Sequence, residues 1–465
     1  MNAIASRLRA TMNATGIGYA GINGVWWLPA VAPYALPLSS KTQLDDIAQA
    51  IFALFDTVNR LYDTLEGNTC GLTQLLQHKV PARLLRYASR APVLSVRPDF
   101  QLLHNQTESV SKIDSISTDA VYRFVATELE ICPSAQGYAH AMQVGYGIQP
   151  DLLHALLALL AGRELIFVST QQWSEFIWEQ LAFCKALTEA GGRAQVWLDV
   201  PIQTLATQLQ RGERWAPPMF GVSDKPDNWD DNVLRRIRTH GLDSFLIQDL
   251  PEDHTDVVAF RFGYLDCFAP ELLDRLQKWE HGGATFLNPT SFLWDSKVVM
   301  AALRLPLVRE QLNRPPRSPK TSEVLDMCIP ETHLLTPNTF QHIVNTRAEW
   351  VLKFAGFDSG QQAWGGRSLQ VGARHTDTSW HDILQRYLDL PFPVVAQRSA
   401  PSAILNIDYF DEQDQVQRLL NGRTRLRSFM LRGAGALGSH LTVVGGVGGV
   451  SEGTGAVQMP IHFAK

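Results

Sequence analysis

Residues 350–372 read Trp-Val-Leu-Lys-Phe-Ala-Gly-Phe-Asp-Ser-Gly-Gln-Gln-Ala-Trp-Gly-Gly-Arg-Ser-Leu-Gln-Val-Gly. The first part, Trp350–Phe354, is mostly apolar and β-favouring, so it predicts a short strand, and this strand carries Lys353. Four glycines follow before residue 367, and glycine lets backbone N–H groups crowd onto a phosphate. Residues 369–371 predict a second strand. We therefore expect a hairpin with a Gly-rich tip.

A strand lysine beside such a tip is typical of a flap that folds over a nucleotide polyphosphate. It is equally typical of an ordinary hairpin with a Gly-rich turn, and residues 350–372 alone do not separate the two interpretations. The glycines do not have the P-loop spacing, and no helix start follows them. A Walker-type NTPase is therefore disfavoured.

The composition of the 465-residue chain is that of a globular protein with a large core, because 45% of the residues are hydrophobic and 19% are charged. The formal net charge of -5 disfavours nucleic-acid binding as the main function. Any anionic ligand must then be met by local lysines and arginines.

The cysteines are scattered, without a Cys-x-x-Cys pair: Cys70, Cys132, Cys184, Cys267 and Cys328. Their spacing supports neither a zinc site nor a disulfide framework, and we expect reduced thiols in a cytoplasmic protein. The most apolar internal run, residues 152–168, contains three polar or charged residues. It predicts a buried helix that leads into a strand rather than a membrane span, and the N-terminus lacks a secretory signal.

Periodicity predicts a long amphipathic helix at residues 42–63, with Ser40 and Thr42 as caps. Shorter helices are expected at residues 72–77 and 82–89, after an irregular stretch over residues 1–40. A strand at 93–100 contains Arg97-Pro98-Asp99, and a second strand covers 120–131. Since strand side chains repeat every second residue, Glu128 and Glu130 should share one face.

From residue 163 the pattern changes to strands that alternate with helices. Strands are expected at residues 164–169, 194–199, 244–247, 256–261 and 285–288, and helices at residues 173–190, 202–209, 231–239, 270–280 and 291–303. This alternation indicates a parallel-sheet α/β unit. A loop is expected at 311–325. Strands at 392–398, 404–410 and 426–432 and a glycine-dense segment at 433–455 complete the chain.

Short motifs follow one another in a fixed order. They are Arg97-Pro98-Asp99, Glu128-Leu129-Glu130, Asn288-Pro289 followed by Lys297, Lys353 with its hairpin, and the strand that holds Gln397. In this order they resemble the circularly permuted ATP-grasp ligases, the group that contains glutathionylspermidine synthetase and eukaryotic glutathione synthetase. The resemblance covers the chain roughly from Pro92 to the end.

The resemblance implies an α/β (α+β) protein with a circularly permuted ATP-grasp fold and an inserted parallel-sheet α/β domain. Residues 1–162 would carry the metal-binding strands, residues 163–283 the inserted domain for the substrate, and residues 284–465 the nucleotide-binding lobe with its Gly-rich lid. In this family the strands that bind the metal come early in the chain, and the lysines that bind the nucleotide come late.

The resemblance also implies a role for each motif residue. Arg97 and Lys353 would be catalytic, with Arg97 on the transferred phosphoryl group. Mg2+ would be bound by Asp99, Glu128 and Glu130. ATP would be bound by Lys297, Lys353, Ser359, Gly365, Gly366 and Gln397.

The implied function is an ATP- and Mg2+-dependent ligase that joins a carboxylate to an amine through an acyl-phosphate. The substrates would be small molecules or peptides, with no nucleic-acid or membrane partner. The chain departs from the family where Glu130 stands in place of the usual Asn, and where its ending, residues 445–455, is looser. These departures keep open a binding protein that has lost turnover, and an ATP-dependent phosphotransferase is a further alternative.

Each motif also has an ordinary interpretation. Glu128 and Glu130 alone are typical of the solvated face of an edge strand, and Lys297 alone is typical of a surface lysine. The histidines His281, His333 and His375 have no metal-ligand spacing, and we expect them to be structural or at the surface.

Overall fold

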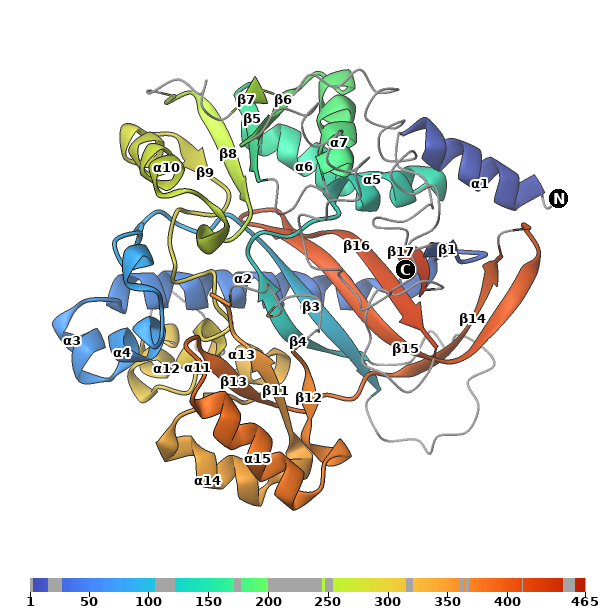
Figure 1. Cartoon of the computed structure of the whole chain (residues 1–465). Coiled ribbons are helices and arrows are strands. Elements are labelled where there is room, and N and C mark those ends of the chain that lie inside the picture. Colours follow the sequence, from blue (N-terminus) through green and yellow to red (C-terminus); the bar gives the residue numbers. More distant parts are fainter. Residues whose placement is uncertain are drawn as a thin grey trace, which may run out of the picture.

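The computed structural model describes residues 3–15, 27–104, 122–170, 177–199, 245–246, 254–314, 321–358, 363, 368–411, 413–445 and 456–464 (Figure 1). These residues form a mixed α/β structure with three sheets. The helices are α1 Ala3–Ala14, α2 Leu38–Leu61, α3 Leu65–Thr69, α4 Leu72–Gln77, α5 Gln136–Gly145, α6 Asp151–Leu160, α7 Ile177–Glu189, α10 Pro270–Gly282, α11 Val299–Ala302, α12 Pro306–Leu312, α13 Thr321–Cys328, α14 Pro337–Asn345 and α15 Asp377–Leu388. None of the helices in these ranges is both long and apolar enough to cross a membrane.

The large sheet joins strands from the two ends of the chain. Its strands are β1 Trp27–Pro29, β2 Tyr34–Pro37, β3 Ser95–His104, β4 Tyr122–Glu130, β14 Ile404–Phe410, β15 Val416–Leu431, β16 Gly435–Val444 and β17 Ala456–Ala464. The order is β1-β17-β16-β15-β3-β4, with β14 beside β15 and β2 beside β17. The early strands β3 and β4 therefore lie next to the late strand β15.

Helices cover both faces of the large sheet. Neighbouring residues of β16 point to opposite faces, so that Ala436 belongs to the core that includes α2 and Leu437 to the core that includes α5 and α6. Helix α2 runs across the strands of this sheet (Figure 1). This sandwiching explains why most of β15 and β16 beyond the β14 hairpin is buried.

The second sheet is fully parallel, as the alternation of strands and helices predicted. Its strands are β5 Glu164–Ser169, β6 Arg193–Leu198, β7 Phe245–Leu246, β8 Val257–Phe262 and β9 Thr285–Phe286, in the order β7-β6-β5-β8-β9. The inner strand β8 is buried along its whole length, as expected for a parallel strand covered on both faces. The helices expected at residues 202–209 and 231–239 lie outside the described residues.

The third sheet contains the predicted hairpin. It consists of β10 Thr332–Leu334, β11 Trp350–Phe354, β12 Gln370–Val371 and β13 Val394–Arg398, in the order β10-β13-β11-β12. Strands β11 and β12 pair antiparallel, which confirms the hairpin. Trp350 and Leu352 pack against α14 and α15, so the alternation of the strand directs Lys353 to the opposite face.

Several boundary predictions were wrong. Helix α2 begins at Leu38, directly after the extended residue Pro37, so that Ser40 and Thr42 lie inside the helix and do not cap it. Residues 1–40 are not all irregular, because they contain α1, β1 and β2. Residues 82–89 form only a short 3-10 turn at Ala82–Leu84, and α13 replaces part of the loop expected at 311–325.

The helix expected at residues 291–303 is reduced to α11, Val299–Ala302. Residues before α11 use their polar groups for distant contacts instead. The Asp295 carboxylate forms a fully buried ion pair with Arg261, with oxygen–nitrogen distances of 2.6 and 3.0 Å. The Lys297 backbone N–H donates to the Ala355 carbonyl at 2.8 Å. Tertiary partners thus override the helical preference of this segment.

Candidate functional site

The charged motif of β3 lies directly beside the charged motif of β4, because these two strands are paired. In the antiparallel register, Arg97 lies opposite Glu130 and Asp99 lies opposite Glu128. Cross-strand partners project from the same face of a sheet. The four side chains therefore form one charged group on the large sheet, as the predicted strand phases require.

Asp99 is buried among three arginines. Its Oδ1 lies 3.1 Å from Arg427 Nε and 3.5 Å from Arg97 Nε, and its Oδ2 lies 3.3 Å from Arg425 Nη1. Burial opposes ionisation of this carboxyl, but the three guanidinium groups outweigh it and hold the pKa of Asp99 well below its usual range. The carboxylate is therefore charged, and the surrounding positive charge exceeds its own.

Glu130 is held on both oxygens. Arg97 Nη2 donates to Oε2 at 3.0 Å, and the Tyr264 hydroxyl donates to Oε1. Burial raises the pKa of Glu130, Arg97 lowers it, and the neighbouring carboxylates of Asp99 and Glu128 raise it, with a net increase. Arg97 also donates to the Ser134 carbonyl, so this arginine links β3, β4 and the turn that follows β4.

Lys353 connects the third sheet to the large sheet. Its buried Nζ donates to the Thr127 carbonyl and to Gln397 Oε1, both at 2.9 Å, and lies 3.9 Å from Glu128 Oε1. Burial lowers the pKa of Lys353 to about 8, and Glu128 opposes this change. The positive charges of Lys297 and Arg425 act in the same direction as burial and contribute to this lowered pKa.

Lys297 lies in the turn before α11, not on the expected helix. Its buried Nζ donates to the Ala363 carbonyl at 2.5 Å, within the Gly-rich part of the hairpin. Gln397 uses its amide oxygen to accept from Lys353 and its Nε2 to donate to Thr332 Oγ1 at 3.2 Å. Ser359, Gly365 and Gly366 lie outside the described residues.

Gly356 allows the hairpin to approach the turn that holds Lys297. Its φ is 143°, and a Cβ added there would lie 2.6 Å from the Asp295 carbonyl oxygen. Only glycine adopts this backbone conformation without strain and permits such a close contact. Gly356 therefore allows the chain just after Lys353 to pack closely against the turn that carries Lys297.

Two functional candidates, Arg425 and Arg427, were missed in the sequence. Both lie on β15, which begins ten residues before the strand expected at 426–432. The signal was present, because Arg423, Arg425 and Arg427 recur at every second residue and must share a face. What the alternation did not reveal is that this face lies beside β3.

The acidic residues do not form a preformed cage for a cation. Among the described residues, Asp99, Glu128 and Glu130 are not a group whose ligand atoms all lie within 4.8 Å of one another. Asp99 and Glu130 have their oxygens engaged by arginines and a tyrosine. Glu128 has a longer contact, 3.9 Å from Oε1 to Lys353 Nζ. Among these three carboxylates it is therefore the one that could receive a cation with the least rearrangement.

No protein-family model and no curated protein matches the sequence. Among solved structures, the chain is similar to a glutathione synthetase-like effector from Globodera pallida in its apo form, with a TM-score of 0.48 and 12% identity over 100% of this chain and 98% of that one. It is also similar to a putative gamma-glutamylcysteine synthetase from Methylobacillus flagellatus, with a TM-score of 0.37 and 10% identity over 87% and 84% of the two chains. At these scores the similarities assign neither a family nor an activity.

Proposed function

We propose that this chain is an ATP- and Mg2+-dependent ligase of the circularly permuted ATP-grasp type, which joins a carboxylate to an amine through an acyl-phosphate. The observation that carries the proposal is the 3.9 Å approach of Lys353 Nζ to Glu128 Oε1. It brings basic groups from the late part of the chain beside acidic groups from the early part, and ATP-dependent ligation with Mg2+ needs both kinds of group at one site.

The charge balance supports binding of a polyphosphate. Five cationic side chains gather around three carboxylates, and both Lys297 and Lys353 are buried. The five are Arg97, Arg425, Arg427, Lys297 and Lys353. Excess positive charge in a buried site is stabilised by an anionic ligand, and fixed cationic groups are the main protein contribution to phosphoryl transfer.

Each residue then has a role. ATP converts the substrate carboxylate into an acyl-phosphate, whose phosphate leaves when the amine attacks. Arg97 and Lys353 would hold the oxygens of the transferring phosphoryl group, while Lys297 and the hairpin loop would hold the remaining phosphates. Gln397 orients the Lys353 ammonium through a 2.9 Å hydrogen bond.

The carboxylates fit Mg2+ in a restricted way. Mg2+ takes oxygen ligands and is commonly bound by one or two carboxylates together with substrate phosphates and water. Glu128 would be the first protein ligand. Asp99 and Glu130 would join it only by exchanging contacts with Arg97, Arg425, Arg427 or Tyr264. Held by Glu128, the ion would supply positive charge to offset that of the phosphates.

The decisive experiment measures ADP release with ATP, Mg2+ and mixtures of candidate carboxylates and amines. We expect ADP release that depends on both substrates and forms an amide. Lys353→Ala should lower kcat by the equivalent of about 3 kcal/mol, the usual effect of removing one electrostatic catalytic group. The exposed lysine of α10 provides the matched control, Lys278→Ala. Unchanged turnover in Lys353→Ala would contradict the proposal.

A second candidate is a nucleotide-binding protein without turnover. The engagement of Asp99 and Glu130 by arginines and Tyr264 favours it, because these contacts compete with a metal ion. Calorimetric titration with ATP separates the candidates. Tight binding that does not depend on Mg2+, without ADP release in any mixture, would support the second candidate. Mg2+-dependent binding with substrate-dependent ADP release would support the ligase.

A further inference from the structure

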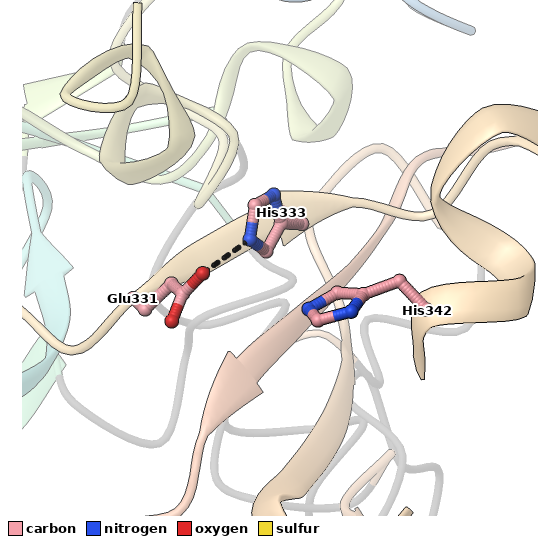
Figure 2. Close-up of side chains that lie close together, drawn as sticks. All are labelled: Glu331, His333 and His342. Atoms are coloured by element: carbon pink, nitrogen blue, oxygen red, sulfur yellow. Dashed lines mark hydrogen bonds and ion pairs between the residues drawn. The ribbon is translucent and has the colours of Figure 1, made fainter. Parts of the chain in front are cut away.

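A second group of polar side chains lies on the other face of the third sheet. Glu331 immediately precedes β10, His333 lies within β10, and His342 lies on α14. One ligand atom from each residue lies within 4.8 Å of the other two (Figure 2). Figure 2 shows the carboxylate and the two imidazoles turned toward a common point. We propose that these residues bind a divalent transition-metal ion of the Zn2+ class.

The backbone fixes the positions of Glu331, His333 and His342 relative to one another. Glu331 and His333 are two residues apart along an extended chain, so their side chains project to the same side. Only Leu335 and Thr336 separate β10 from α14. Thr339 Oγ1 donates to the Leu334 carbonyl at 2.7 Å and accepts from the Thr336 backbone N–H at 2.9 Å. This capping box fixes the start of α14 against β10, and with it the position of His342.

A buried tryptophan supports both imidazole rings. The Trp350 ring contacts His333 at a centroid distance of 5.5 Å and His342 at 5.6 Å, with interplanar angles of 67° and 75°. Its Nε1 donates to Thr346 Oγ1 at 2.7 Å, which fixes the indole. Packing of this kind limits the rotamers of the histidines, and a preorganised ligand set binds metal more tightly.

Arg398 orients the carboxylate without occupying the oxygen that faces the histidines. Arg398 Nε donates to Glu331 Oε2 at 2.9 Å, while Oε1 lies 2.8 Å from His333 Nε2. The guanidinium also forms an ion pair with Glu349, so two carboxylates share its single charge. A partner that holds a ligating carboxylate in this way typically increases metal affinity.

The donor set selects the class of metal. Two imidazole nitrogens and one carboxylate oxygen suit Zn2+ and similar ions and leave a coordination position for water, whereas Mg2+ and Ca2+ prefer oxygen ligands. The side chains of His333 and Glu331 are 26% and 34% exposed, so an ion can reach them from solvent. The site is independent of the proposed ligase site, because Thr332 and Gln397 occupy the opposite face of the same sheet.

The test uses full-length protein from which any affinity tag has been removed and all metal has been stripped. Titration with Co2+, a spectroscopic substitute for Zn2+, should give visible absorption bands that saturate at one equivalent. Zn2+ should abolish these bands, and excess Mg2+ should leave them unchanged. Because His342 is exposed, His342→Ala should fold normally, as checked by circular dichroism, and should lose the Co2+ bands.

The matched control is His381→Ala, which removes an exposed histidine of α15 outside the group. It should bind Co2+ as the wild type does. Glu331→Gln, which removes the charge and keeps the shape, should weaken binding by at least about tenfold. Zn2+ should raise the melting temperature of the wild type and of His381→Ala but not of His342→Ala. Absence of stoichiometric Co2+ binding in the wild type, or equal loss of binding in both histidine variants, would overturn the proposal.

Discussion

The ammonium of Lys353 lies 3.9 Å from the carboxylate of Glu128, although β11 and β4 belong to different sheets. Lys353 is buried, and the contact is reinforced by the hydrogen bond from Lys353 to the Thr127 carbonyl. It therefore links the large sheet, with its arginines and carboxylates, to the hairpin that carries the Gly-rich loop.

Glu128→Gln should weaken ATP binding in the presence of Mg2+ by at least about tenfold, or about 1.4 kcal/mol. The reason is that Glu128 is the carboxylate best placed to share a cation with bound phosphates. Binding without Mg2+ should be unchanged or tighter, since the variant removes a negative charge near the phosphates. Calorimetric titration with and without Mg2+ measures both effects. An exposed residue of α10 gives the control, Glu271→Gln, and equal behaviour of the two variants would contradict the prediction.

Asp99→Asn should destabilise the fold by about 3–5 kcal/mol, because it removes the buried charge that Arg97, Arg425 and Arg427 share, while Arg97 keeps a second carboxylate partner, Glu130. Urea unfolding measures the change in the free energy of unfolding. The control is Asp408→Asn, which removes an exposed partner of Arg418 at 3.7 Å and should cost less than about 1 kcal/mol. A small effect at Asp99 would mean that the arginine cluster is not held by this carboxylate.

The stability of the protein should depend on pH through Lys353. Burial lowers the pKa of Lys353 from its usual 10.5 to about 8. Between these two values the unfolded chain binds more protons than the folded chain, so the free energy of unfolding rises with pH. Below the lower value the lysine is charged in both states, and the cost of burying the charge applies in full.

Lys353→Met removes this titration and provides the comparison. The wild-type free energy of unfolding, measured relative to that of Lys353→Met by urea unfolding, should increase by about 3 kcal/mol as the pH rises from about 7.5 to about 10.5. Two curves that stay parallel across this range would show that the Lys353 ammonium is stabilised in the fold as well as it is in water.

Gly356→Ala should destabilise the hairpin by about 1–3 kcal/mol. Alanine at φ 143° is strained, and its Cβ would meet the Asp295 carbonyl oxygen at 2.6 Å. Gly282→Ala is the control, because a Cβ there meets its nearest neighbour, Thr255, at 3.9 Å. Thermal unfolding compares the variants. Equal melting temperatures would indicate that the turn at Asp295 yields readily to an added methyl group.

The local sequence pattern was sufficient to predict those elements whose formation depends on only a few neighbouring residues. The hairpin at 350–371, the phases of β3 and β4, and the parallel sheet around β8 all follow from alternation, glycine placement and the spacing of apolar residues. These features depend on backbone geometry that each segment carries with it. Alternation along the two predicted strands also allows Arg97 and Glu130 to lie on one face of the sheet, as they do when the strands pair.

Other features depended on which segments meet. The turn before α11 forms because Asp295 and Lys297 find partners at Arg261 and Ala355, far away in the sequence. The order of residues fixes which side chains are available and, through the alternation of each strand, the face on which they lie. That the arginines of β15 surround Asp99 and that His333 lies near His342 depends on the assembled fold. The neighbours of a strand follow from burial and charge compensation across the whole fold and not from any one segment.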